Sequence, residues 1–274
     1  MRSPLLLLSF GLPIALASGC GGSSGGTSKY LNLTGNWNIA LTPSNPMQIG
    51  PLLGGYITNT NSSVSGTLLL QVPACSASLV SMPATSPVSV PIAGTLAADG
   101  NIAFTGTSSD GLTLSVNGVV TYPSAPVPGI YYPLDGAYAI SGGCTASESG
   151  SVIGLAVLPL ATTYTGTLQS ASGSSYGASL TVAESGPNSQ GVYTLSGAAT
   201  FTGNPCFSSG AITSSVVFGD NVDVTISLNN NSSLEFTAFA PPVPPNSLLT
   251  SILYNVSGGA CAGDAGSGYL TGRG

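Results

Sequence analysis

The chain has 274 residues, of which 4% are charged and 42% are apolar, and its formal net charge is −6. Its three Lys and Arg side chains cannot form the basic surface that nucleic acid or an anionic lipid layer requires, so both are excluded as partners bound by charge. It has no histidine, which excludes the Ser-His-Asp triad and the usual zinc enzymes. The apolar fraction is ordinary, so we expect a buried core.

The first residues have the pattern of an export signal. Arg2 precedes an apolar run from Leu5 to Ala17, and small residues lead to Cys20. A spanning helix needs about 20 apolar residues, so this run is too short to be one. We expect a lipoprotein signal peptide over 1–19, acylation of Cys20 and a flexible Gly/Ser tether over 20–29. The alternative is an ordinary secretory signal, with Cys20 as a free thiol.

Acylation of Cys20 predicts an exported protein held by lipid in the bacterial cell envelope. Gly21 follows the cysteine where Asp would favour retention, a pattern that resembles sorting to the outer membrane. The membrane, reached through this lipid, is therefore an expected partner. After removal of the signal, the chain keeps two cationic side chains, Lys29 and Arg273, and all nine Asp and Glu residues, so its net charge falls to −7.

Beyond the tether, the chain reads as short strands separated by turns, and no segment shows a helical period. Asp99-Gly100 and Asp110-Gly111 suit hairpin turns that need positive φ. We expect an all-β fold of about 16 strands, in two tandem antiparallel units shaped as barrels or sandwiches. Because Lys is almost absent, strand edges should be closed, covered or broken by proline. The clearest alternating runs are Val88–Leu96, Leu112–Val116, Asn221–Leu228 and Ser233–Phe239.

An internal repeat supports two units. The run Asp135–Cys144 resembles Leu253–Cys261, and each contains Ser-Gly-Gly before its cysteine. Upstream, Val64–Cys75 resembles Leu195–Cys206. We therefore place unit 1 at 30–160 and unit 2 at 161–274.

Four cysteines remain once Cys20 is set aside, in an exported chain where disulfides persist. They allow three pairings, between which spacing does not decide. A duplicated unit most simply keeps its bond inside each copy, which predicts Cys75–Cys144 and Cys206–Cys261. Pairing across the units is the alternative.

Two resemblances follow from these motifs. The signal, the tether, Gly35-Asn36-Trp37 and the repeated cysteine segments together resemble a class of uncharacterised β-rich bacterial lipoproteins, which implies export but no particular activity. The Gly-x-Trp at 35–37 also resembles the first strand of lipocalin- and avidin-type barrels. That resemblance implies that Trp37 plugs a barrel and that Arg273, on the last strand, stacks over it.

We find no catalytic or metal-binding constellation and expect no cofactor. Glu148 and Asp264 occupy equivalent turns of the two units, which favours a turn or capping role. Asp220 and Asp223 are close in sequence, but they lack the spacing of a calcium loop.

The aromatic residues are the remaining candidates for a ligand site. Trp37, Tyr131, Tyr132 and Tyr138 could line a cleft, although the same residues also suit a core. We therefore expect a lipid-anchored envelope protein, not an enzyme, that binds a glycan, a small apolar ligand or a partner protein. A structural or adhesive surface protein without a pocket is the alternative, and a carboxylate-dependent hydrolase is the third reading.

Overall fold

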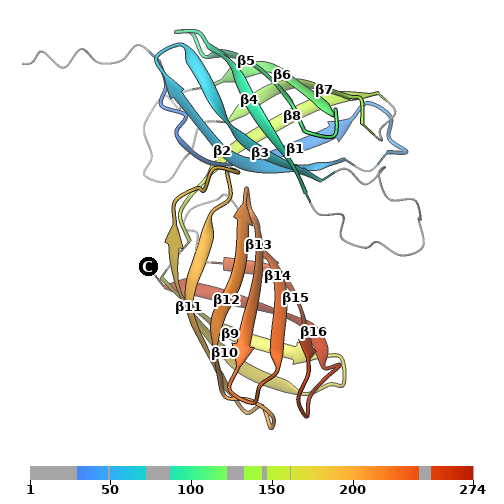
Figure 1. The fold of residues 1–274 in the computed structure, drawn as a ribbon, viewed down its shortest axis with the longest axis vertical. Coiled ribbons are helices and arrows are strands. Elements are labelled where there is room, and N and C mark those ends of the chain that lie inside the picture. Colours follow the sequence, from blue (N-terminus) through green and yellow to red (C-terminus); the bar gives the residue numbers. More distant parts are fainter. Residues whose placement is uncertain are drawn as a thin grey trace, which may run out of the picture.

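The computed structural model describes residues 30–48, 50–71, 87–121, 133–143, 147–160, 162–240 and 248–273. These residues form sixteen strands in two closed antiparallel barrels of eight strands each (Figure 1). The structure confirms the all-β fold and the two eight-stranded units, and it decides for barrels over sandwiches. No helix in this part of the chain is long and apolar enough to cross a membrane.

Each barrel is built from strands in chain order, and its last strand pairs with its first. Barrel 1 comprises β1 (Gly35–Pro43), β2 (Leu52–Thr60), β3 (Ser63–Gln71), β4 (Val88–Leu96), β5 (Asn101–Thr107), β6 (Thr113–Val120), β7 (Leu134–Ser141) and β8 (Glu148–Val157). Barrel 2 comprises β9 (Thr163–Ser170), β10 (Ser175–Ser185), β11 (Thr194–Thr202), β12 (Ser209–Phe218), β13 (Asn221–Leu228), β14 (Ser233–Phe239), β15 (Leu248–Ser257) and β16 (Ala265–Arg273).

Alternation of apolar and polar side chains explains these strands. In β13, Val222, Val224 and Ile226 are buried, while the residues between them are more exposed. The alternating runs expected at Val88–Leu96 and Ser233–Phe239 coincide with β4 and β14. Closure leaves no free strand edge in either barrel, which suits a sequence with almost no lysine to guard one.

The two barrels have separate cores and separate sheets. Side chains on the inner faces fill each barrel, with Trp37 and Phe104 in the core of barrel 1 and Tyr176 and Phe201 in that of barrel 2. The link between the barrels runs over 158–162, between β8 and β9.

One end of barrel 2 packs against the side wall of barrel 1 at β1 to β3 (Figure 1). The amide of Asn36 makes two hydrogen bonds with the backbone of Gly219: its Nδ2 donates to the carbonyl oxygen at 2.8 Å, and its Oδ1 accepts from the N–H at 2.8 Å. Asn38 Nδ2 donates to Asp220 Oδ2 at 2.9 Å. Trp37, between these two asparagines, points into barrel 1. The segment therefore serves a core and an interface on opposite faces of one strand.

Close backbone approach and apolar contact complete this interface. A Cβ on Gly54 of β2 would lie 2.7 Å from the Cα of Gly219, so no larger residue fits there without a shift. Leu69 of β3 packs with Val192 and Phe218 in a small buried cluster. The two barrels are thus docked through specific contacts.

Candidate ligand site at the mouth of barrel 2

The interior of barrel 2 has no room for a ligand. It retains a cavity of about 20 Å³, lined by apolar side chains such as Leu168, Phe201 and Phe236. Ligand sites in proteins usually measure about 300 to 1,000 Å³. A site in this barrel must therefore lie at an end or on the outside.

Two of the aromatic residues proposed as ligand contacts are core residues. Trp37 is 2% exposed and its Nε1 donates to the Leu33 carbonyl oxygen at 2.7 Å, which satisfies its one polar group inside barrel 1. Tyr138 is 3% exposed, and its hydroxyl donates to Glu148 Oε1 at 2.5 Å. Burial, together with the neighbouring Glu148, raises the pKa of Tyr138. Both side chains therefore lie in the core of barrel 1, and Trp37 also borders a hollow of about 360 Å³ between the barrels.

The structure does not test the other predicted contacts. Tyr131 and Tyr132 lie outside the described residues. Arg273 ends β16 of barrel 2, whereas Trp37 lies in barrel 1, and the description does not extend to the Arg273 side chain.

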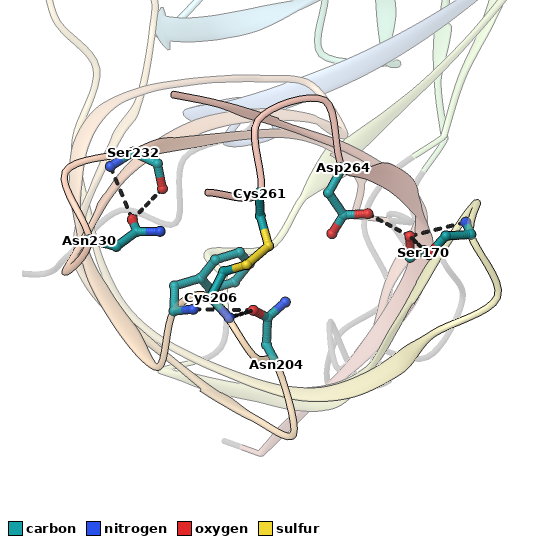
Figure 2. The surroundings of a disulfide bond; sticks show 9 residues. Ser170, Asn204, Cys206, Asn230, Ser232, Cys261 and Asp264 are labelled. Carbon is teal, nitrogen blue, oxygen red and sulfur yellow. Dashed lines mark hydrogen bonds between the residues drawn. A yellow bond between two sulfur atoms is a disulfide. The ribbon is translucent and has the colours of Figure 1, made fainter. Parts of the chain in front are cut away.

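The predicted pair Cys206–Cys261 forms a disulfide, with its Cα atoms 6.0 Å apart (Figure 2). It joins the loop between β11 and β12 to the loop between β15 and β16 at the end of barrel 2 remote from barrel 1. Cys75 and Cys144 fall between β3 and β4 and between β7 and β8, the matching places of barrel 1. These two cysteines and Cys20 lie outside the described residues, so their predicted roles stay predictions.

Beside the disulfide lies a hollow of about 680 Å³, which we call the mouth of barrel 2. It is lined by Tyr176, by residues 203–205, by the β9–β10 turn and by the segment Cys261–Ala265. Its volume falls within the usual range for a small-molecule site. Asn204 shapes one wall, because its Oδ1 accepts from the backbone N–H of Cys206 at 2.8 Å.

Asp264 is the acidic residue in the lining of this hollow. Ser170, the last residue of β9, donates from Oγ to Asp264 Oδ1 at 2.5 Å (Figure 2). Asp264 directly precedes β16, the strand that pairs with β9. The sequence predicted a turn or capping role for Glu148 and Asp264. Asp264 does close a turn, since its N–H donates to the Cys261 carbonyl oxygen at 3.0 Å, and both carboxyl groups also accept hydrogen bonds from side chains of neighbouring strands.

Two hydroxyl groups near Asp264 are buried without a hydrogen-bond partner, those of Tyr176 and Tyr254. Each residue is 4% exposed. Burial, then Tyr254 and Asp264, raise the pKa of Tyr176. Burial also raises the pKa of Tyr254, although Tyr176 and Ser170 oppose the rise. These groups therefore act on one another's pKa, although neither hydroxyl makes a hydrogen bond of acceptable geometry. Because the pKa of each hydroxyl is raised, both phenols stay protonated and can donate.

Two further hollows have no buried, unpartnered polar group among the described residues of their lining. One of about 730 Å³ lies on barrel 1 near Asn101 and Val119, and one of about 360 Å³ lies between the barrels near Tyr193. In the second, Glu184 Oε2 accepts from the Leu160 N–H at 2.9 Å, and burial raises the pKa of Glu184. None of the buried, unpartnered side-chain atoms found in the described ranges belongs to a residue lining either hollow.

The described residues contain no group of three or more His, Cys, Asp or Glu side chains able to hold a metal ion. Sequence reasoning did not name Tyr176, Tyr254 or Ser170 as site residues. The repeat could have identified Tyr254, since Tyr254 occupies the position in unit 2 that Tyr138 occupies in unit 1, and Asp264 occupies that of Glu148.

Neither a known protein family nor a curated protein matches this chain. Among solved structures, it is similar to one described as "a putative AttH (NE1406)" from Nitrosomonas europaea, at 12% sequence identity and a TM-score of 0.26. The match covers 86% of this chain and 92% of that one.

Proposed function

We propose that the protein is a lipid-anchored component of the bacterial cell envelope that binds a small ligand at the mouth of barrel 2. The observation that carries the proposal is a pair of buried, unpartnered hydroxyls beside Asp264, of which Tyr176, like Asp264, belongs to the lining of a hollow of about 680 Å³ and Tyr254 lies behind it. An unmade hydrogen bond at a buried polar group costs about 1 to 3 kcal/mol, and such costs concentrate at functional sites.

The anchor rests on the N-terminal sequence. Metabolic labelling with a fatty-acid probe should mark the protein, and Cys20→Ser should lose the label. Label retained in that variant would reject the anchor and leave the ligand site untouched.

The ligand site is tested with an obstructing variant. Full-length protein is incubated with a polar metabolite extract, and the molecules that co-elute with it are identified by mass spectrometry. Ala262→Trp should abolish capture, because Ala262 is exposed and lines the mouth. Ala98→Trp is the matched control, since Ala98 is an exposed turn alanine lining the hollow of barrel 1. Capture that survives Ala262→Trp would place binding elsewhere.

A second function has its own supporting observation. A barrel filled by side chains needs no ligand, and the cavity of about 20 Å³ in barrel 2 suits a structural or adhesive surface protein. That role predicts no capture by the unaltered protein. The carboxylate-dependent hydrolase has the least support, because such enzymes use two carboxyl groups and the lining of the mouth contains one.

A further inference from the structure

The two barrels contain the same local arrangement, which allows one to serve as a reference for the other. Tyr138 lies opposite Gly150 in barrel 1, and Tyr254 lies opposite Gly266 in barrel 2. In each case the ring covers the glycine: a Cβ on Gly150 would lie 2.9 Å from Tyr138 Cε1, and a Cβ on Gly266 would lie 2.8 Å from Tyr254 Cε1. The two tyrosines are therefore equivalent in position and packing.

The hydrogen bonding around them differs. In barrel 1, the Tyr138 hydroxyl donates to the Glu148 carboxyl group, so both groups have a hydrogen-bond partner. In barrel 2 the acid is Asp264, one methylene shorter. The residue opposite the glycine also changes, from Pro43 in barrel 1 to Ser170 in barrel 2. Asp264 accepts from Ser170, and the Tyr254 hydroxyl is left without a partner.

Barrel 2 also adds a second phenol at this point. The rings of Tyr176 and Tyr254 meet edge to face with centroids 6.0 Å apart, and the Tyr176 ring lines the mouth. Barrel 2 thus holds two buried hydroxyl donors next to the carboxyl group that lines the mouth, whereas the tyrosine and the acid of barrel 1 bond to each other.

The chemistry of these groups selects the ligand. Neutral phenols need an acceptor for their protons, and Asp264 needs donors. An anion would meet the Asp264 carboxylate and a chain of net charge −6. An ammonium ion donates but cannot accept, so it would leave the phenol protons unpartnered. A hydroxyl group accepts and donates at once, and two adjacent hydroxyls meet both needs together.

We infer that the mouth of barrel 2 binds a saccharide through two adjacent ring hydroxyls, which donate to Asp264 and accept from the hydroxyls of Tyr176 and Tyr254. This inference rests on the proposed function, because it names the ligand class of the same site. The phenol oxygens are buried in the structure, so the inference requires the turn at Ala262–Asp264, which lines the mouth, to move when the ligand binds. Gly263 in that turn has a φ of 87°, and a Cβ there would meet no atom within 4 Å.

The test uses full-length protein in an alkyl polyoxyethylene detergent, because a glucoside detergent would itself compete. The probes are the methyl glycosides of glucose, galactose, mannose and N-acetylglucosamine, with cyclohexanol and tetramethylammonium chloride as probes that lack adjacent hydroxyls. Binding is followed by the NMR shifts of backbone amides at 170–176 and 262–266. We expect at least one glycoside to shift them, and neither of the other two probes to do so.

Variants then assign the contacts. Tyr176→Phe and Tyr254→Phe should each weaken glycoside binding about three- to ten-fold, the usual effect of one lost neutral hydrogen bond. Tyr138→Phe is the matched control and should leave the affinity unchanged. Equal affinity in all three variants would overturn the inference.

Failure of the inference and failure of the proposed function have different signatures. Mouth shifts caused by cyclohexanol or tetramethylammonium, with every glycoside silent, would overturn the saccharide and keep the ligand site. Silence of all six probes, together with no metabolite captured from the extract, would overturn both.

Discussion

The equivalent tyrosines give the sharpest test of the structure, since one hydroxyl is bonded and the other is not. Tyr138→Phe removes the donor to Glu148, which is 8% exposed, and so leaves a buried carboxyl group without that bond. Tyr254→Phe removes a hydroxyl that has no partner. Both changes keep the ring that covers a glycine of the next strand.

The expected effects have opposite signs. Losing a buried bond to a carboxyl group costs about 2 to 3 kcal/mol, so Tyr138→Phe should lower the free energy of unfolding by that amount. Removing a buried hydroxyl that makes no bond relieves its desolvation cost, so Tyr254→Phe should raise it by about 1 kcal/mol. The gap of about 3 to 4 kcal/mol corresponds to about 10 °C between the two melting temperatures, at about 2 to 4 °C per kcal/mol.

The assay is guanidinium unfolding of the two variants and the unaltered protein, followed by tryptophan fluorescence and far-ultraviolet circular dichroism. Trp37 reports on barrel 1, whereas the circular dichroism reports on both barrels. If Tyr254→Phe destabilises as much as Tyr138→Phe, the Tyr254 hydroxyl has a partner in solution, and the argument from unmade bonds fails.

Three further outcomes follow from the fold. Cys206→Ser should destabilise barrel 2 by about 4 kcal/mol in denaturant unfolding, because the disulfide closes a separation of 55 residues, and the double variant with Cys261→Ser should cost no more. Burial raises the pKa of Asp220 to about 6. Below about pH 4 the group is protonated in both the folded and the unfolded protein, whereas at higher pH the folded protein must ionise a buried carboxyl group, so the stability falls as the pH rises through 6. Asp220→Asn should therefore match the unaltered protein at pH 4 and exceed it by about 1 kcal/mol at pH 7.5, allowing for screening of a half-buried group; equal melting temperatures at both pH values would refute this. Gly54→Ala should loosen the docking against Gly219, seen as faster proteolysis of the 158–162 link with both barrels still folded.

Much of the fold could be predicted from the sequence because it depends on local patterns. The alternation of apolar and polar residues predicted the first and last residues of β4, β13 and β14 correctly, since side chains on successive positions face opposite sides of a strand. The repeat predicted the duplication and the pair Cys206–Cys261, because equivalent loops carry equivalent cysteines. Near-absence of lysine predicted strand edges that are closed, covered or broken by proline, and the structure shows the first of these, closure.

The candidate site could not be predicted in the same way. The sequence shows that Trp37, Tyr138 and Tyr254 are aromatic, but the same residues serve a core or a cleft equally well. Tyr176, Tyr254, Ser170 and Asp264 are brought together by the pairing of β9 with β10 and β16 and of β15 with β16. Whether Asp264 bonds a serine or a tyrosine depends on one methylene and on the residue across the strand.

The sequence by itself determined that this chain forms two strand-built units and which of its cysteines are equivalent, since periodicity and repetition are properties of the chain. Only the tertiary structure decided that Asn36 and Asn38 hold barrel 2 against barrel 1, and that barrel 2 leaves two hydroxyls unbonded. Those outcomes depend on which side chains meet across strands far apart in sequence, which local patterns do not encode.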